Sequence, residues 1–452
     1  MNISSEVGLL GAWIEAQVAY RWPGLSIAVV HDQEIVWSRG FGWADVDRKI
    51  PAAPDTLYRV ASITKTFTAT AIMQLRDAGK LRLDDRVQDY LPWFTPPTTH
   101  EDAPPITLRH ILTHTTGLAR EAPFPYWTEL NFPTIEEIRD AVKTQSAVLG
   151  TEDRWKYSNL AFVIAGEVVA AVTGMAWAAY VRSHVLEPLG MRSSFVLNPV
   201  ADQPGLARGY SRRMPNGQRT PTGSYDLLGI ASAAALTTSV TDLARFVMLQ
   251  FRSGPAGDAQ ILRGSTLREM QRPHWVEPEW QAGWGLGFHM YRANGRALVG
   301  HGGSLRGYRS DMRFSPVDKL GIIALINADD GDAQLVVNKA FEWVAPAVAR
   351  ATAPPPPVAD PGWQRYVGRY RNAWGDAQVL VMGGRLTIIF PNLPDPLWAP
   401  ATLVPVGEHT FRIETKDGYA SHGEHVVFEL DDSGTVTRVT IGYDHMLPVT
   451  EW

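Results

Sequence analysis

The sequence predicts an α+β chain that continues into a small all-β unit. Three observations lead to this prediction. Helical and strand-like segments are mixed in residues 1–350 without a regular βαβ alternation, which is typical of an α+β fold. Four consecutive prolines at 354–357 then interrupt the pattern, because proline cannot continue a helix. The residues that follow carry only strand signals, which favours a small antiparallel barrel or sandwich.

Length and composition limit the classes of protein that remain. The chain has 452 residues, more than one hydrophobic core usually organises, and its 45% hydrophobic and 20% charged residues are typical of a globular protein. Its 42 Lys and Arg against 47 Asp and Glu leave no basic excess, so we expect neither nucleic acid nor a membrane as a partner. The absence of cysteine excludes disulfides, thiolate metal sites and a Cys nucleophile.

An amphipathic helix is expected at the N-terminus, because apolar residues recur there at helical spacing: Val7, Leu10, Ile14 and Val18. No basic segment precedes them, so the sequence does not predict a signal peptide. We expect a cytoplasmic protein, or a periplasmic or secreted one if a signal was removed. The longest uncharged stretch, residues 227–241, is too short and too polar to span a bilayer.

Periodicity predicts the main elements of the first 350 residues. A hairpin is expected where two strand-like runs, 25–30 and 34–40, flank a short polar turn. Further helices and strands follow, which suggests an antiparallel sheet flanked by helices. The expected helices are 64–78, 160–172, 241–251 and 334–348, and the expected strands are 286–291, 311–314 and 321–327.

The C-terminal part shows two strong hairpin signals. Runs 379–382 and 386–390 flank a Gly-Gly turn, and runs 426–430 and 436–441 flank Asp-Asp-Ser-Gly. We therefore divide the chain into three parts. These are a mixed domain over 1–350, a proline-rich linker over 351–362, and an antiparallel β-barrel over 363–452.

Most familiar motifs are absent from the sequence. It contains no Gly-x-Ser-x-Gly elbow, no His-Glu-x-x-His and no phosphate-binding glycine loop. The glycines of 283–287 lack the third glycine that a dinucleotide-binding turn requires. No spacing of Asp or His indicates a metal site, and we expect no cofactor.

A Ser and a Lys three residues apart, Ser62 and Lys65, stand at the start of the helix expected at 64–78. At that spacing the two side chains project from one face of the first turn. A Ser hydroxyl needs a base to become a nucleophile, and Lys serves as one when burial lowers its pKa. The alternative is a helix cap beside a solvated lysine. The pair by itself does not decide between them.

Two later segments add groups of the same chemistry. Tyr157 and Asn159 stand at the entry to a helix, where a phenol can relay protons and an amide can bind an acyl group. The Gly-His-Gly-Gly-Ser run of 300–304 lies between strand-like segments, where glycines let a backbone approach a ligand closely. Each has a structural alternative: a buried Tyr with an Asn cap, and a Gly-rich turn. For His114, in a turn-like segment, packing is the favoured role.

Taken together and in this order, these segments resemble the serine β-lactamase and penicillin-binding-protein superfamily. Within it the resemblance is to the branch of class C β-lactamases, D-aminopeptidases, DD-peptidases and esterases. It extends from about residue 10 to 345 and implies a β-lactamase/transpeptidase-like fold with a helical subdomain. Further segments support it: Leu83-Asp84-Asp85, Tyr90-Leu91-Pro92, Arg109 to Leu118, and Trp284-Gly285-Leu286-Gly287.

The resemblance implies a role for each group. Ser62 would be the acylated nucleophile, Lys65 its base and Tyr157 the group that handles protons of the leaving atom and the deacylating water. Whether Lys65 or Tyr157 is the acylation base stays open. Asn159 would hold the acyl side. The oxyanion hole would come from backbone N–H groups of Ser62 and of Ser304, which follows Gly303.

One position departs from the family pattern. His301 stands where many relatives carry a Lys, and His301-Gly302-Gly303 offers a titratable ring and no hydroxyl where Lys-Thr-Gly offers a cation and a hydroxyl. We therefore expect weaker recognition of a substrate carboxylate. The motif looks more like the D-aminopeptidases and esterases. We expect a serine hydrolase that acts on small esters, amides or D-amino-acid peptides.

Several alternatives remain open from the sequence. One alternative is a β-lactamase or DD-carboxypeptidase. Another is a penicillin-recognising sensor or scaffold without turnover. The C-terminal barrel resembles lipocalin-like appendages of related peptidases and esterases. It either shapes the cleft or covers a surface and promotes a homo-oligomer. Candidates for binding a substrate amine include Glu121, Asp226 and Asp311, which nothing in the sequence places at the site.

Overall fold

The computed structural model describes residues 2–97, 100–196, 203–257, 259–353, 355, 357–418 and 420–449. The chain divides into two compact units, Met1–Ala351 and Thr352–Trp452. Among the described helices, no single one is long and apolar enough to cross a membrane. Only the pair Asn159–Thr173 and Trp177–Leu186, bent by 78°, meets the criteria of length and composition together.

A nine-stranded antiparallel sheet forms the centre of the first unit, in the order β3-β2-β1-β11-β10-β9-β8-β7-β6. The expected hairpin is confirmed, because β1 and β2 pair from Gly24↔Gly42 to His31↔Glu34. A separate two-stranded ladder joins β4 (Tyr58–Arg59) to β5 (Thr237–Thr238). The strands of the main sheet are β1 (Gly24–His31), β2 (Glu34–Asp45), β3 (Ile50–Pro51), β6 (Trp275–Val276), β7 (Ala282–Trp284), β8 (His289–Ala293), β9 (Arg296–Leu305), β10 (Tyr308–Ser315) and β11 (Leu320–Ile326).

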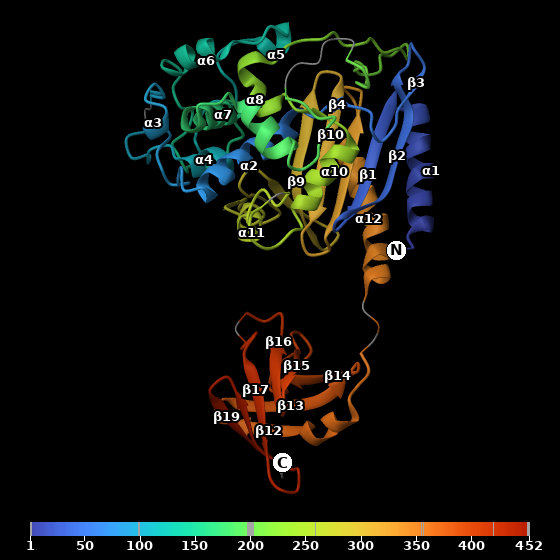
Figure 1. Cartoon of the computed structure of the whole chain (residues 1–452), viewed down its shortest axis with the longest axis vertical. Helices are drawn as coiled ribbons and strands as arrows, with labels where there is room; N and C mark the ends of the chain where they lie inside the picture. The colour runs from blue at the N-terminus through green and yellow to red at the C-terminus, as the bar shows by residue number, and fades with distance from the viewer. Residues whose placement is uncertain are drawn as a thin grey trace. The chain divides into compact units, whose positions relative to one another are not determined.

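Both faces of the sheet are buried, because side chains alternate between them along each strand. On β1, Ile27 packs into one core cluster and Ala28 into the other. The first cluster lies under α1 (Ser4–Tyr20) and α12 (Ala333–Thr352), which are side by side on that face of the sheet (Figure 1). The expected N-terminal helix is thereby confirmed.

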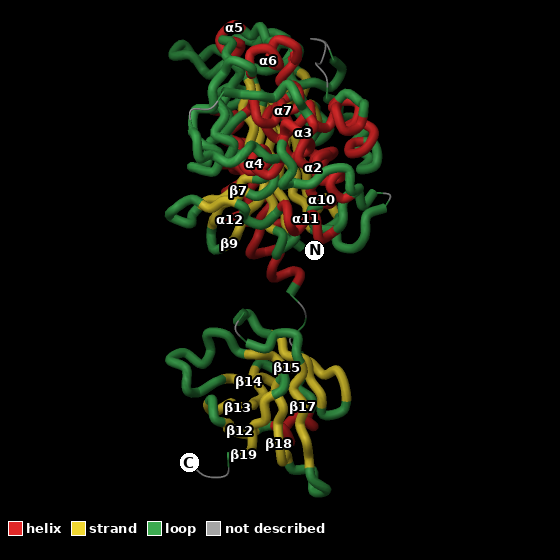
Figure 2. The backbone as a smooth tube through the Cα atoms, turned by 90° about the vertical axis from the view of Figure 1, so that its left-hand side faces the viewer, coloured by secondary structure: helices red, strands yellow, loops and turns green. Residues whose placement is uncertain are grey.

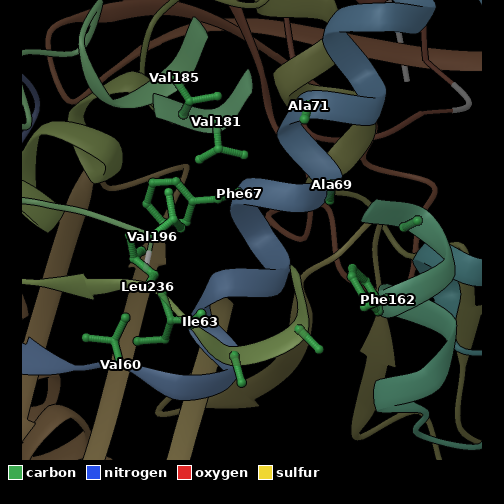
Figure 3. Packing of buried hydrophobic residues seen from close by; sticks show 14 of the residues in the cluster. Val60, Ile63, Phe67, Ala69, Ala71, Phe162, Val181, Val185, Val196 and Leu236 are labelled. Atoms are coloured by element: carbon green, nitrogen blue, oxygen red, sulfur yellow. The ribbon is translucent and has the colours of Figure 1, made fainter. Parts of the chain in front are cut away.

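The opposite face is covered by a larger helical region that surrounds α2. Phe67 of α2 stacks on Phe246 of α10 at 4.1 Å between ring centroids. Figure 3 shows Phe67 projecting from α2 toward Val181 and Leu236. All four expected helices are present, with bounds that differ by at most four residues from those expected. The longer helices of this region are α2 (Thr64–Asp77), α4 (Leu108–Thr113), α6 (Ile135–Val142), α7 (Asn159–Thr173), α10 (Val240–Leu249) and α11 (Gly264–Met270), and the shorter ones are α3 (Val87–Tyr90), α5 (Tyr126–Glu129), α8 (Trp177–Val181) and α9 (Ala231–Ala234).

The second unit is a closed antiparallel barrel of strands β12 to β19, as the sequence predicted. The described part of residues 353–449 consists of strands and loops with one short helical turn, Pro361–Tyr366 (Figure 2). Its own core gathers aromatic residues, among them Tyr366, Tyr370 and Phe428. The strands are β12 (Gly368–Asn372), β13 (Gly375–Met382), β14 (Arg385–Ile389), β15 (Ala401–Gly407), β16 (Thr410–Glu414), β17 (His425–Leu430), β18 (Val436–Ile441) and β19 (Asp444–Pro448).

Two expectations about strands are wrong. The strand expected at 286–291 begins only at His289, because residues 285–288 form a turn in which Gly287 has φ +81°. The Gly-rich run of 300–304 does not lie between strands. It lies within β9, where His301 is opposite Met312 of β10.

Candidate active site

Ser62 lies in a short 3₁₀ turn, Ala61–Ile63, between β4 and α2. The backbone of Val60, just before this turn, forms two hydrogen bonds that hold it in place. Val60 N–H donates to Leu236 O at 3.0 Å, and Ser310 Oγ donates to Val60 O at 2.9 Å. Ser62 lines a cleft of about 920 Å³. The turn therefore presents the hydroxyl to a space that can hold a small substrate.

Lys65 lies beneath Ser62, fully buried in the first turn of α2. Its Nζ donates to Ser62 Oγ at 3.3 Å, to Asn159 Oδ1 at 2.7 Å and to Ala233 O at 2.9 Å. Burial lowers the pKa of Lys65 to about 7, with Glu121 opposing that shift. Near neutral pH a large share of this lysine is an uncharged amine, which has a lone pair to accept a proton.

Asn159, the first residue of α7, connects Lys65 to a carboxylate. Its Nδ2 donates to Glu121 Oε1 at 2.6 Å, so its Oδ1 is the atom turned to the lysine. Tyr126 OH donates to the other oxygen of Glu121 at 2.5 Å, and Arg120 Nε lies 3.4 Å from Oε1. This network fixes the Asn159 amide beside the nucleophile.

Tyr157 lines the cleft within a cluster of rings. Its ring centroid lies 5.0 Å from Lys65 Nζ and 4.4 Å from the ring of His114. Burial raises the pKa of Tyr157, and a hydrogen bond with Ser62 opposes that rise. Tyr157 is therefore a protonated phenol at neutral pH, able to give a proton rather than take one.

His114 is a packing residue, as expected from the sequence. It is fully buried, and its Nδ1 accepts a hydrogen bond from Ser158 N–H at 3.1 Å. Its ring lies 4.9 Å from that of Trp284 and 5.1 Å from that of Phe162. Burial holds its pKa well below the usual range, so it supports the wall of the cleft as a neutral ring.

Strand β9 forms the opposite wall and contacts the turn that carries Ser62. A Cβ on Gly303 would lie 2.1 Å from Val60 O and 2.2 Å from Ser310 Oγ, so only glycine permits this approach. Ser304 follows on the same strand and is exposed to the cleft. The nucleophile and the end of β9 thus face one another across the cleft.

His301 is buried in the same wall and is uncharged. Its Nδ1–H donates to Gly302 O at 2.5 Å, and Nε2 has no hydrogen-bond partner among the described residues. Burial, with Lys65 and Arg313 nearby, holds the pKa of His301 well below its usual range. His301 is therefore a neutral ring at this position, and its acceptor nitrogen Nε2 is buried.

The structure brings the seven predicted site residues together. Six of them line the cleft, and Lys65 lies directly below them. Of the three acids considered for a substrate amine, Glu121 and Asp311 line the cleft, whereas Asp226 is exposed and does not. Within the described ranges, no three His, Asp or Glu side chains gather as a metal site would require. The six are Ser62, Tyr157, Asn159, His301, Gly303 and Ser304.

Sequence reasoning missed three parts of the site. The carbonyl of Ala233 fixes Lys65, Glu121 orients Asn159 rather than standing free, and Trp284 packs beside both histidines of the cleft wall. These residues come from segments far apart in the chain. The Trp284 segment had a signal through the family resemblance, and Glu121 was named as an acid for a substrate amine, but its contact with Asn159 was not predicted.

An antiparallel sheet flanked by helices, with a Ser-x-x-Lys pair facing a Gly-rich strand across a cleft, defines the serine β-lactamase and penicillin-binding-protein superfamily. Comparison with known families agrees. The Beta-lactamase family profile matches residues 10–345, and the chain belongs to that family.

Relatives are found among curated proteins and solved structures. Beta-lactamase-like protein 2 of Dictyostelium discoideum is 30% identical over 304 residues, which are 66% of this chain and 54% of that protein. The chain thus spans about half the length of this relative. The octameric penicillin-binding protein homologue from Pyrococcus abyssi is 25% identical, with a TM-score of 0.65 and coverage of 98% of this chain and 99% of that one. D-amino acid amidase from Ochrobactrum anthropi SV3 is 25% identical, with a TM-score of 0.64 and coverage of 77% and 100%.

Proposed function

We propose that this protein is a serine hydrolase that forms an acyl-enzyme on Ser62. The observation that carries the proposal is the buried Lys65 amine, 3.3 Å from Ser62 Oγ with its pKa lowered to about 7. In the proposed step, neutral Lys65 accepts the proton of Ser62 as Oγ attacks the acyl carbon. The carbonyl oxygen becomes an oxyanion, bound by the backbone N–H groups of Ser62 and Ser304.

Tyr157 is proposed as the proton donor to the leaving group. Its raised pKa keeps the phenol protonated, and its position beside Ser62 in the same cleft supports this role. When the oxyanion collapses, the bond to the leaving oxygen or nitrogen breaks and that atom receives the Tyr157 proton, which is replaced from Lys65. In deacylation a water gives its proton to the same pair as its oxygen attacks the acyl carbon. When this second oxyanion collapses, the bond between Ser62 Oγ and the acyl carbon breaks, Oγ takes that proton back, and the acid is released.

The proposed substrates are small esters, amides and D-amino-acid peptides. Neutral His301 supplies no cation for a substrate carboxylate, which argues against an efficient β-lactamase or DD-carboxypeptidase. Three of the five arginines that line the cleft already lie near acids: Arg120 near Glu121, Arg309 near Asp329 and Arg313 near Asp311. The other two, Arg212 and Arg306, are exposed and form no ion pair with a described residue. Similarity to a D-amino acid amidase supports an amide substrate.

A free amine on the substrate has an acceptor in the cleft. Glu121 lines the cleft, and each of its oxygens accepts one hydrogen bond, which leaves lone pairs for an ammonium group. We therefore expect an amino-acid amide with a free amine to be cleaved faster than its N-acetyl form. Equal rates of cleavage for the free and N-acetyl forms would show that the substrate amine is not recognised.

A panel of substrates tests the proposal. Wild type and Ser62→Ala are compared on a p-nitrophenyl ester, D- and L-amino-acid amides and a chromogenic β-lactam, with multiple turnovers followed. We expect sustained turnover of an ester or amide by wild type and none by Ser62→Ala. Stoichiometric release without turnover would instead support the sensor or scaffold alternative, and turnover by the variant would reject Ser62 as the nucleophile.

Self-association is proposed on a separate ground. The penicillin-binding protein homologue from Pyrococcus abyssi is described as octameric, and its match to this protein covers 98% of this chain and 99% of that one. We expect a homo-oligomer in solution, measured by light scattering on a size-exclusion column. A mass of one chain, 49.9 kDa, at micromolar concentration would contradict this.

A further inference from the structure

A second cavity of about 580 Å³ lies in the first unit, lined by residues of 44–59, 203–209 and 222–224 together with Tyr308. No described residue lines both this cavity and the cleft of Ser62. Arg59, from strand β4, forms part of its wall and is only 4% exposed. A charged side chain is thus buried at an enclosed space outside the catalytic site.

Among the described residues, the guanidinium of Arg59 has no anionic partner. No described residue forms an ion pair or a hydrogen bond with it, and the acids that line the same cavity, Asp45 and Asp55, are not paired with it. Its Cζ lies 4.3 Å from the centroid of the Tyr225 ring. Tyr225 in turn stacks on Phe132 at 5.7 Å. This stack covers a face of the guanidinium and fixes its plane.

An unpaired buried arginine is unfavourable, because a guanidinium does not lose its proton and a buried charge is stable only when it is paired. The remaining N–H groups of a stacked guanidinium point outward in its plane. Two of these N–H groups, side by side, can donate hydrogen bonds to the two oxygens of one carboxylate. An anion in the cavity would supply the missing partner.

We propose that this cavity binds a small organic carboxylate, held by Arg59. Apolar side chains in the wall, Ile50, Pro51 and Leu206, offer a surface for the rest of the ligand. Asp45 and Asp55 in the same wall disfavour a doubly charged phosphate, which favours a single carboxylate. The site is independent of the activity proposed for Ser62.

Thermal denaturation of the full chain tests the proposal. Sodium acetate, benzoate and phosphate are titrated at constant ionic strength against wild type, Arg59→Gln and Arg208→Gln. Arg208 lines the same cavity but pairs with Asp47 at 2.7 Å, so it is the matched control. We expect a saturable rise in Tm of roughly 2–4 °C with a carboxylate for wild type and Arg208→Gln, and none for Arg59→Gln.

Other outcomes overturn the proposal. These are no saturable rise with either carboxylate, an equal rise in Arg59→Gln, or a rise with phosphate alone. If Arg59→Gln does not fold, Leu206→Trp serves instead, because it fills the cavity while Arg59 remains; a full rise in that variant contradicts the site. Ser62→Ala is titrated as well. Its Tm should rise as in wild type, even if the proposed hydrolase activity proves wrong.

Discussion

At the scale of single residues, the protonation of Lys65 controls the proposed chemistry. Burial favours the neutral amine, and Glu121, two hydrogen bonds away through Asn159, favours the charged form. Burial is the larger effect, so the pKa of Lys65 falls to about 7. A proton acceptor beside Ser62 is therefore available at neutral pH and is lost in acid.

The first prediction concerns pH. With an uncharged ester, kcat/KM should rise as pH increases through about 7 and then level off, because only neutral Lys65 accepts the Ser62 proton. Removing the charge of Glu121 in Glu121→Gln should move this rise to lower pH, since that charge raises the pKa of Lys65. The measurement is a pH–rate profile of both proteins. A profile that is flat between pH 5 and 9, or a shift in the opposite direction, contradicts the assignment.

The second prediction concerns Tyr157. Tyr157→Phe keeps the ring and removes the proton donor, so we expect kcat to fall by roughly 100- to 10,000-fold with little change in binding. Tyr126→Phe is the matched control, because Tyr126 OH contacts Glu121 and not the nucleophile. Single-turnover kinetics measure both. A loss below about tenfold in Tyr157→Phe would remove Tyr157 from the proton path.

The sequence predicts those site residues whose pattern lies within a few neighbouring positions. Ser62 and Lys65 are three positions apart, and Tyr157 and Asn159 stand together at a helix entry, so spacing and residue type identify them. The carbonyl of Ala233 reaches Lys65 across 168 positions of sequence. A backbone carbonyl carries no residue-type signal, so this contact is seen only in the folded chain.

At the scale of elements, the close approach of β9 to the nucleophile turn is decisive. Gly303 and Gly302 are neighbours on β9, but only Gly303 has no space for a Cβ atom. A Cβ on Gly303 would meet Val60 O at 2.1 Å, whereas a Cβ on Gly302 meets no atom closer than 3.4 Å, the distance to Asp311 Oδ1. The two glycines therefore form an internal comparison.

The third prediction uses this comparison. Gly303→Ala should lower kcat/KM by at least about 100-fold, because β9 must move away from Val60 and a misplaced oxyanion donor costs that much. Gly302→Ala should stay within about tenfold of wild type, since a methyl group fits there. Steady-state kinetics on one ester measure both, with circular dichroism to confirm folding. Equal losses in the two variants would show that the approach of β9 is not required.

Elements with strong periodicity are predictable from the sequence, and β9 is not. Helix α2 and the β1–β2 hairpin were predicted within a few residues. Strand β9 carries Gly-His-Gly-Gly, which has almost no strand propensity of its own. It is a strand because β10 pairs with it on one edge and β8 on the other. Its conformation comes from these neighbours, so local residue types could not reveal it.

At the scale of the whole molecule, the two compact units have separate cores. No described core cluster contains residues of both Met1–Ala351 and Thr352–Trp452. The fourth prediction is that calorimetry of the full chain resolves two unfolding transitions, because each core loses its packing as its own cooperative unit. The larger enthalpy should belong to the first unit. One transition with equal calorimetric and van't Hoff enthalpies would contradict this.

The order of strands in the main sheet lies beyond sequence reasoning. Ile27 of β1 pairs with Ala324 of β11, so the centre of the sheet joins the two ends of the first unit. Nothing in either apolar run specifies the other as its partner, because many runs have the same composition. The interruption of the pattern at residues 354–357 is different, because four consecutive prolines are a local signal.

The central claim is that Ser62 becomes acylated. The most direct measurement is the intact mass of the protein after acid quenching with a reactive p-nitrophenyl ester, with released nitrophenol followed in parallel. Wild type should gain the mass of one acyl group, and Ser62→Ala should gain none and release no nitrophenol above background. The same adduct on both proteins, or nitrophenol released equally by both, would contradict the assignment of Ser62 as the nucleophile.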